Sequence, residues 1–174
     1  MNKNILWFKL AMPLAAAILF AGCGEPDPAA PPEDPAEVPE TAAPPADEAE
    51  EIVITGNDMM EFDVTEFTVQ AGSEVTITFR NIGQMPVEAM GHNLAILTLG
   101  TDPIEFANTS QAHPQNDYID PAKEDQVIAA TAILGPGEEE TLEFTAPDES
   151  GDYPFVCSFP GHTQAGMRGV MIVE

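Results

Sequence analysis

The stretch CSFPGHTQAGM, residues 157–167, decides the fold, because it places a thiol, an imidazole and a thioether within one short segment. Pro160 and Gly161 form a turn there, which lets Cys157 and His162 reach one point from a single loop. A further imidazole comes from His92, which lies far upstream in the stretch MGHN at residues 90–93. His92 must come from a distant strand, so the pattern favours a site anchored in a rigid β-sheet.

The combination of His92, Cys157, His162 and Met167 predicts a metal site of a definite kind. Two imidazoles, one thiolate and one weak axial thioether are the donor set of a type-1 copper centre. The soft sulfur donors favour Cu(I) and the imidazoles suit Cu(II), so a site held between the two preferences needs little rearrangement on oxidation. Each residue alone has a simpler explanation, since a lone Cys or Met is usually packed in a core. His113 lies in a polar stretch beside Pro114, and we expect it at the surface.

Short apolar runs separated by Gly and Pro turns fill the chain from residue 52 to residue 174. Val75, Ile77 and Phe79 alternate with polar residues, which is typical of a strand with one buried face. Further runs of strand type lie at 53–55, 62–69, 94–99, 127–134, 142–145, 154–157 and 170–173. Between 101 and 126 the pattern lapses, which indicates an insertion that can hold a short helix. The sequence therefore predicts an all-β sandwich of seven or eight strands.

Residues 1–22 have the pattern of a secretory signal. Lys3 and Lys9 form a basic head, an apolar core follows at 10–20, and Ala21 and Gly22 end it before Cys23. The sequence LFAGC at 19–23 resembles the lipobox of bacterial lipoproteins, which implies that Cys23 is acylated and anchors the chain to a membrane. The alternative is an ordinary secretory peptide with an incidental Cys. We expect the protein in the bacterial cell envelope, facing the periplasm, with the inner or outer membrane left open.

Residues 23–51 are predicted to be the lipidated Cys followed by a tether. The segment 24–51 contains 8 Pro and 10 acidic residues and lacks aromatic side chains. Such a composition cannot bury enough apolar surface to offset its ordering entropy, so we expect disorder. A binding motif for a partner is the alternative, and a spacer that lifts a domain off a membrane is the simpler interpretation.

The net charge of the chain is strongly negative, with 30 acidic residues against 5 Lys and Arg, a total of −25. Residues 52–174 hold 20 of the acidic and 3 of the basic residues, so the domain itself carries −17. Nucleic-acid binding is excluded, because it needs clustered Lys and Arg. The acidity favours a docking partner with a basic face. Two Cys in the whole chain exclude a disulfide framework.

The stretches GNDMMEF at 56–62, MP at 85–86, MGHN at 90–93 and CSFPGH at 157–162 together resemble azurin. The resemblance covers nearly all of 52–174 and implies a Greek-key cupredoxin fold of eight strands, with a helical flap at 102–126. It also implies a copper ligand set, a second layer around it and an apolar rim. By this resemblance the equatorial ligands are His92, Cys157 and His162, the axial ligand is Met167, and Gly91 offers its backbone carbonyl on the opposite axial side. The residues implied to support these ligands are Asn93, Ser158 and Phe159. The residues implied to form the apolar rim are Met60, Met85, Pro86, Pro160 and Ala165.

The sequence departs from the azurin pattern in the ligand loop. Four residues, 163–166, separate His162 from Met167, where azurins have three. This spacing is similar to that of rusticyanin and auracyanin, and it puts the axial geometry and the contact to Gly91 in question. Leu94 also stands in the place of the family's buried Trp, and the family's disulfide has no second domain Cys to form it.

The function predicted from these features is one-electron transfer between redox proteins by a single type-1 copper. The expected partners are c-type cytochromes or membrane oxidoreductases, and the protein is expected to be a monomer and not an enzyme. A copper chaperone or storage protein is the alternative, although such proteins tend to expose their ligands. A multicopper enzyme would need additional His-rich centres, which three His in the chain cannot supply.

Overall fold

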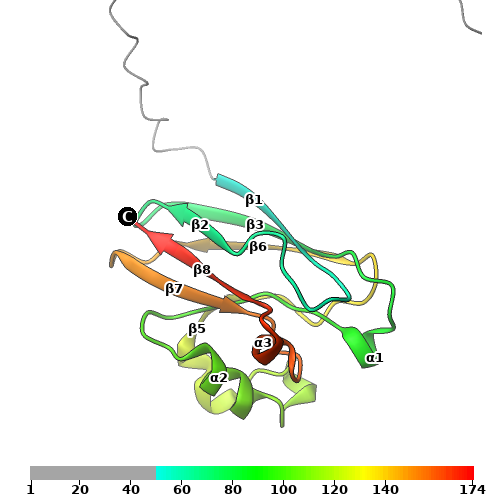
Figure 1. Cartoon of the computed structure of the whole chain (residues 1–174). Coiled ribbons are helices and arrows are strands. Elements are labelled where there is room, and N and C mark those ends of the chain that lie inside the picture. The colour runs from blue at the N-terminus through cyan, green and yellow to red at the C-terminus, as the bar shows by residue number, and fades with distance from the viewer. Residues whose placement is uncertain (1–49) are drawn as a thin grey trace, which may run out of the picture. The chain divides into compact units, whose positions relative to one another are not determined.

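The computed structural model describes residues 50–174, so the predicted signal, the lipidation site Cys23 and nearly all of the predicted tether lie outside the described residues. The described chain forms two sheets (Figure 1). One sheet has the order β1 (Glu50–Gly56), β3 (Glu74–Asn81) and β6 (Glu139–Thr145). The other has the order β2 (Glu66–Val69), β8 (Arg168–Val173), β7 (Gly151–Val156), β4 (Ala95–Leu97) and β5 (Val127–Ala130).

The hydrophobic core forms because each strand presents one apolar face to the other sheet. On β3 the predicted alternation holds, with Val75, Ile77 and Phe79 all buried and the residues between them facing outward. Phe62 packs edge-on against Phe79, with ring centroids 5.8 Å apart, and it also contacts Phe155, with ring centroids 5.5 Å apart. Burying side chains of this size contributes roughly 1.5–3 kcal/mol each.

The strand pairing confirms the predicted β-sandwich of Greek-key type and places the ends of the strands that carry the site. The pairs β1–β3 and β2–β8 are parallel, and the remaining pairs are antiparallel. Strand β7 runs antiparallel to β8 with Val156 opposite Arg168. Cys157 therefore follows directly after β7, and Met167 directly precedes β8, at the same end of the sheet.

The insertion between β4 and β5 is helical, as predicted for the flap. It contains α2 (Pro103–Ser110) and the 3-10 turns η1 (Pro114–Asn116) and η2 (Pro121–Gln126). Asp102 begins α2 by accepting hydrogen bonds from the N–H groups of Ile104 and Glu105, which otherwise have no partner in a first helical turn. Phe106 is fully buried and anchors α2 against the second sheet.

Some details differ from the sequence prediction. Strand β1 begins at Glu50, two residues before the expected start of the domain. The apolar run at 127–134 is a strand only as far as Ala130, and its end pairs instead with the segment of His92. Two single-turn helices, α1 (Val87–Met90) and α3 (His162–Ala165), were not predicted, because four residues give no measurable helical period. Among residues 50–174, no helix is long and apolar enough to cross a bilayer.

Candidate metal centre

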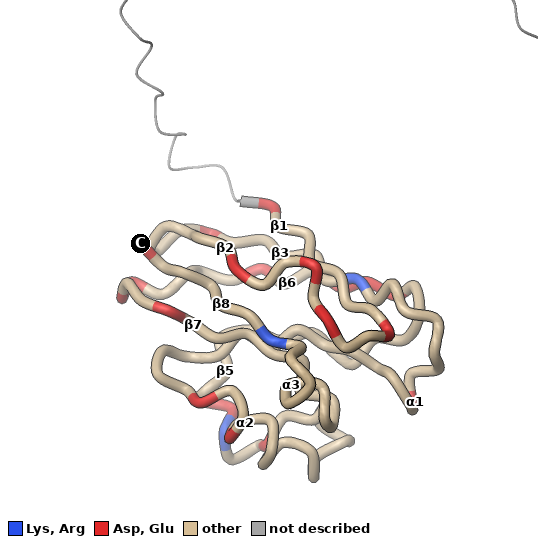
Figure 2. The backbone as a smooth tube through the Cα atoms, viewed as in Figure 1, with Lys and Arg blue, Asp and Glu red and all other residues tan. Residues whose placement is uncertain are grey.

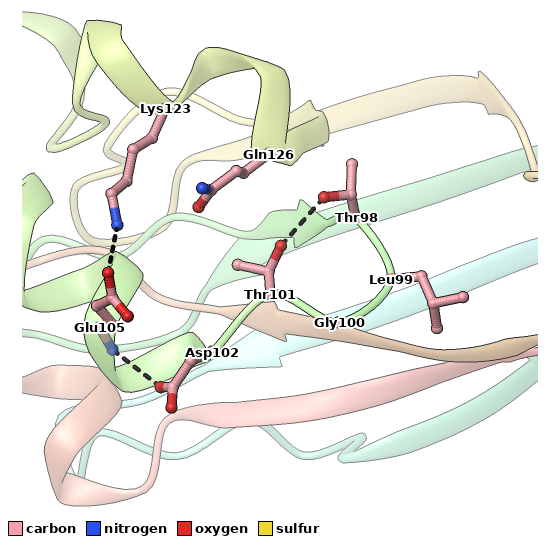
Figure 3. Close-up of a pocket in the computed structure, with 8 residues that line it drawn as sticks. All are labelled: Thr98, Leu99, Gly100, Thr101, Asp102, Glu105, Lys123 and Gln126. Carbon is pink, nitrogen blue, oxygen red and sulfur yellow. Dashed lines mark hydrogen bonds and ion pairs between the residues drawn. The ribbon is translucent and has the colours of Figure 1, made fainter.

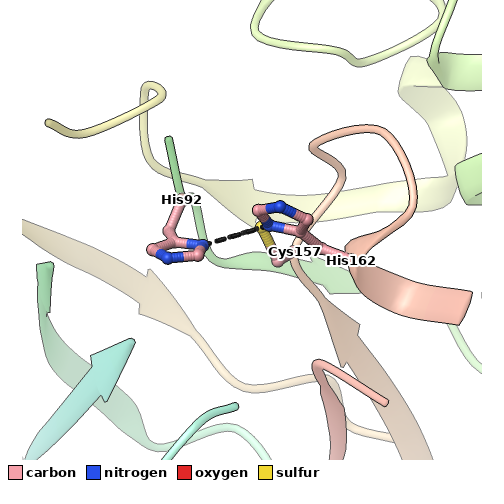
Figure 4. Close-up of side chains that lie close together, drawn as sticks. All are labelled: His92, Cys157 and His162. Carbon is pink, nitrogen blue, oxygen red and sulfur yellow. Dashed lines mark hydrogen bonds between the residues drawn. The ribbon is translucent and has the colours of Figure 1, made fainter. Parts of the chain in front are cut away.

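His92, Cys157 and His162 converge in the structure (Figure 4). The two Nδ1 atoms of His92 and His162 lie 3.1 Å apart. The Cys157 Sγ lies 3.4 Å from Nδ1 of His162 and 3.8 Å from Nδ1 of His92. All three side chains are at most 3% exposed. Three donor atoms thus face one another inside the protein, at the end of the second sheet.

The sheet holds Cys157 and His92 in place through backbone hydrogen bonds. Cys157 follows the last residue of β7, and its N–H donates to the carbonyl of Met167 over 3.1 Å. His92 forms an isolated antiparallel bridge with Leu134, in which each N–H donates to the other carbonyl over 3.2 and 2.7 Å. Asn81 closes this corner, because its buried Nδ2 donates to the carbonyl of Leu134 over 2.9 Å.

The longer ligand loop closes through the single-turn helix α3. Gly161 enters it with a φ of +87° and Gly166 leaves it with a φ of +119°, values that favour glycine. The N–H of Gly166 reaches the carbonyl of His162 over 3.2 Å, and the N–H of Met167 reaches the same carbonyl over 3.0 Å. The turn absorbs the additional residue and leaves Met167 fully buried, with its backbone bonded to both Cys157 and His162.

Asn93 joins the two ligand segments through its buried side chain. Its Oδ1 accepts from the N–H of Ser158 over 2.8 Å, and its Nδ2 donates to the Ser158 Oγ over 2.8 Å and to the carbonyl of Asp117 over 3.3 Å. Ser158 also donates from Oγ to the carbonyl of Asp117 over 3.0 Å. This network fixes the segment after His92 to the segment after Cys157 and connects both to the flap.

Phe159 lies against a ligand and against the flap. Its ring centroid is 4.7 Å from that of His162 and 5.1 Å from that of Tyr118. Asp117 and Tyr118 both adopt the left-handed backbone region, with φ of +49° and +54°. That conformation is uncommon for residues other than glycine, and here it places the Tyr118 ring on Phe159 while Asp117 Oδ1 accepts from the N–H of Ile133 over 2.9 Å.

Burial dominates the electrostatics of the three donors. It raises the pKa of Cys157 to about 12, although backbone N–H groups of Asn93 and Phe159 act in the opposite direction. Burial also lowers the pKa of His162 to about 4, with a further contribution from His92. The pKa of His92 is lowered by burial, and the Asp58 carboxylate opposes this change. The metal-free site therefore contains neutral side chains, and a metal must displace the thiol proton of Cys157.

The donor set fits a single type-1 copper. Both imidazoles present the same nitrogen, Nδ1, toward the Cys157 sulfur, and no carboxylate belongs to the group. Nδ1 is therefore the His92 nitrogen that faces the sulfur, and Nε2, on the far side of the ring, is buried and points away from it. Two imidazoles, a buried thiol and the buried thioether of Met167 match the preferences of copper rather than those of Mg²⁺ or Ca²⁺, which take oxygen donors.

Gly91 is buried beside His92 and needs to be a glycine for steric reasons. A Cβ there would lie 2.5 Å from Cγ2 of Ile133 and 2.7 Å from the carbonyl oxygen of Val87. The close approach follows from the hydrogen bond that the N–H of Gly91 donates to that carbonyl at the end of α1. An axial role for the Gly91 carbonyl stays a prediction.

The predicted rim residues lie on loops near the site and differ in exposure. Met85 is 42% exposed, Pro86 and Ala165 are exposed, and Met60 and Pro160 are half-buried. The loop of Met60 is fastened to the loop of Met85, because the Asp58 carboxylate accepts from the N–H groups of Gln84 over 2.8 Å and Met85 over 3.3 Å. Met59 and Ile82, at 69% and 53% exposure, extend the apolar surface of these two loops. The sequence did not reveal Ile82, because it stands alone in a polar turn.

Two further features lie apart from the donor cluster. A pocket of about 330 Å³ lies between the loop after β4 and the flap, with Thr98, Glu105 and Lys123 among its lining residues and none of the predicted ligands (Figure 3). His113, predicted at the surface, is half-buried in the flap with its Nε2 3.5 Å from Asp120 Oδ1.

Thr163 and Arg168 are residues of the site that sequence reasoning missed. Thr163 is fully buried and donates from Oγ1 to the carbonyl of Cys157 over 2.7 Å. Arg168 donates from Nη1 to the carbonyl of Thr163 over 2.9 Å. Thr163 lies within the stretch 157–167 and Arg168 directly after it, but neither carries a metal donor, so only their place next to the ligands in the sequence could have drawn attention to them.

The chain is similar in sequence to a family of copper-binding proteins. Residues 49–174 match the family model described as copper binding proteins, plastocyanin/azurin family. Azurin from Alcaligenes faecalis is 35% identical over 115 residues, which are 64% of this chain and 89% of that protein. Outer membrane protein H.8 from Neisseria gonorrhoeae is 36% identical over 111 residues, which are 63% of this chain and 60% of that protein.

The solved structures agree with the sequence matches. Dithionite-reduced auracyanin from Roseiflexus castenholzii superposes with a TM-score of 0.64 at 36% identity and covers 73% of this chain and 99% of that one. Auracyanin A from Chloroflexus aurantiacus gives a TM-score of 0.64 at 31% identity, over 73% of this chain and all of that one. The match spans the whole described domain and includes the buried His92, Cys157 and His162, and the chain belongs to the plastocyanin/azurin family of copper-binding proteins.

Proposed function

We propose that this protein is a blue copper electron carrier that passes single electrons between redox proteins of the bacterial envelope. The observation that carries the proposal is the buried convergence of the His92 and His162 Nδ1 atoms on the Cys157 sulfur. Copper held there supplies one-electron chemistry by alternating between Cu(I) and Cu(II). His92, Cys157, His162 and Met167 are the ligands in this proposal, and Gly91 is a weaker axial candidate.

The protein contributes a donor arrangement that does not need to move. The N–H of Cys157 is fixed to Met167, His92 is fixed to Leu134, and Asn93 fixes both ligand segments to each other. A site that keeps its geometry in both oxidation states loses little energy to rearrangement. Burial also excludes water from the sulfur. These properties suit a carrier better than an enzyme, which must admit a substrate.

The rim around His162 is the proposed point of electron exchange. Met60, Met85, Pro86, Pro160 and Ala165 are uncharged in a domain where roughly one residue in five carries a charge. An exposed apolar surface of this kind often marks a contact site, and electron-transfer complexes tend to be small and transient. With −17 on the domain, the matching partner is a redox protein with a basic face, such as a c-type cytochrome or a membrane oxidoreductase.

The proposed location is the periplasmic side of a bacterial membrane, with Cys23 as lipid anchor and residues 24–51 as tether. The lipobox-like sequence supports this proposal, as does the similarity to a protein named as an outer membrane protein in Neisseria. Mass spectrometry of the protein from a bacterial membrane fraction tests it. An N-terminal peptide that begins at an acylated Cys23 is expected, and an unmodified Cys23 in the mature chain would contradict the anchor.

The function is tested by adding Cu(II) to the purified full-length protein and recording its visible spectrum. We expect an intense thiolate-to-copper band that disappears on reduction and returns on oxidation while the copper stays bound. The variant Cys157→Ser should lack the band, and His113→Gln, which changes a histidine of the flap, should keep it. A wild type without the band would refute the copper site, and copper loss on each reduction would favour the chaperone alternative.

A further inference from the structure

We propose that Arg168 is a positioning residue of the copper site, which closes the extended ligand loop and raises the reduction potential through its uncompensated positive charge. The inference rests on the proposed electron carrier. It concerns a residue that carries no metal donor atom and belongs to no motif.

Arg168 is unusual among the few cations of the domain. Residues 52–174 contain three Lys and Arg, and two of them are ion-paired: Arg80 with Glu139 over 2.5 Å and Lys123 with Glu105 over 3.3 Å. No carboxylate of the described residues lies within ion-pair distance of Arg168. Figure 2 shows a blue segment beside α3, where Arg168 begins β8. In a domain with 20 acidic residues, the one unneutralised cation therefore lies next to the ligand loop.

The guanidinium of Arg168 forms a hydrogen bond to the ligand loop rather than an ion pair with a carboxylate. Its Nη1 donates to the carbonyl of Thr163 over 2.9 Å. Thr163 in turn donates from Oγ1 to the carbonyl of Cys157 over 2.7 Å. A chain of two hydrogen bonds thus connects Arg168 to the backbone of the ligand that carries the thiol. The guanidinium is a cation.

The hydrogen bond from Arg168 to Thr163 is expected to stabilise the loop, because the loop is longer than in azurins and contains only one helical turn. The carbonyls of such a turn have few partners within it, and a basic side chain can supply one. In α3 the carbonyl of Thr163 also accepts a bond from the N–H of Gly166, which has a φ of +119°. Glycine at that position gives the backbone freedom to move. Arg168 restricts this freedom at Gly166, immediately before the ligand Met167.

The charge of Arg168 also biases the redox equilibrium. A positive charge near the metal destabilises Cu(II) more than Cu(I), since the interaction energy is proportional to the charge on the metal. The many acidic residues of the domain act in the opposite direction. The negative net charge of the domain lowers the reduction potential, and the positive charge of Arg168 opposes this effect.

The test compares three variants of the full-length protein: Arg168→Gln, Arg168→Lys and the matched control Arg80→Gln. The Lys variant keeps the positive charge but loses the planar guanidinium group. The Arg80 variant removes one positive charge from an ion pair between β3 and β6. Spectroelectrochemical titration gives the potential of each copper-loaded protein. Amide hydrogen exchange of residues 163–166 in the metal-free proteins gives the stability of the loop without reference to copper.

We expect Arg168→Gln to lower the ratio of Cu(I) to Cu(II) at a fixed potential by about threefold, which is about 30 mV for a one-electron couple. Arg168→Lys should retain most of the wild-type potential, and Arg80→Gln should change it little. Loop exchange should be faster in both Arg168 variants and unchanged in the control.

Three results would each overturn the proposal. The first is an unchanged reduction potential in Arg168→Gln. The second is an equal shift of the reduction potential in Arg80→Gln, which would show that only net charge matters. The third is amide hydrogen exchange of the loop at the wild-type rate in both Arg168 variants. Absence of a thiolate-to-copper band in the wild type would instead refute the proposed function, so the two failures are distinguishable.

Discussion

Replacing Asn93 by Ala should destabilise the metal-free protein and disturb the copper site when metal is bound. The side chain is buried and forms hydrogen bonds to Ser158 and Asp117, which are distant from it in sequence. In the variant the buried N–H of Ser158 loses its acceptor, which costs about 1–3 kcal/mol. The Ser158 hydroxyl keeps the carbonyl of Asp117, so its loss is smaller, about 1 kcal/mol. The expected decrease in the free energy of unfolding is about 2–4 kcal/mol.

Urea unfolding of the metal-free protein, followed by circular dichroism, measures this change without interference from copper. The matched control is Asn108→Ala. Asn108 is an exposed asparagine on α2 whose Oδ1 accepts from Nε2 of Gln164 over 2.7 Å. The loss of an exposed hydrogen bond should change the stability by no more than about 0.5 kcal/mol. If Asn93→Ala changes the stability no more than the control does, the network around Ser158 does not hold the two ligand segments together.

Three further perturbations have definite expected outcomes. In Gly56→Ala the new Cβ would lie 2.7 Å from Cε of Met167, so displacement of the thioether should change the visible spectrum and the potential of the copper-loaded protein without abolishing binding. Asp58→Asn removes the anion that acts on His92, so the reduction potential measured by voltammetry should rise by roughly 30 mV. Burial raises the pKa of Tyr153, whose hydroxyl donates to a backbone carbonyl, so the folded state keeps this proton to higher pH than the unfolded state. This contribution to stability is complete below pH 10 and is lost as the pH rises through the folded pKa, so the advantage of wild type over Tyr153→Phe in urea unfolding should shrink at alkaline pH.

Matched variants make these outcomes decisive. Gly135→Ala adds a Cβ whose nearest neighbour is Glu138 Oε2 at 3.3 Å, and it should leave the spectrum unchanged. Asp63 also accepts from two backbone N–H groups, but it is not among the groups that shift the pKa of His92 or His162. Asp63→Asn should therefore leave the reduction potential near the wild-type value. A constant difference between wild type and Tyr153→Phe at all pH values would show that Tyr153 ionises equally in both states.

The sequence by itself determined the class of fold and the donor set. Alternation of apolar residues, as at Val75, Ile77 and Phe79, is a local property of one strand, so it can be read without knowing the partner strand. The spacing of Cys157 and His162 around Pro160 and Gly161 is local in the same way, because one tight turn brings both side chains together. The insertion that forms the helical flap could likewise be predicted, because the strand pattern is lost between residues 101 and 126.

Only the tertiary structure decided how the distant parts meet. Three contacts depend on where separate segments lie in space. They are the pairing of His92 with Leu134, the hydrogen bond from the N–H of Met85 to the Asp58 carboxylate, and the hydrogen bond from Arg168 to Thr163. The helix α3 could not be predicted from the sequence, because a single turn is stabilised by its surroundings rather than by its own residues. Hydrogen bonds between segments are set by the packing of the two sheets, and no local pattern of residue types specifies them.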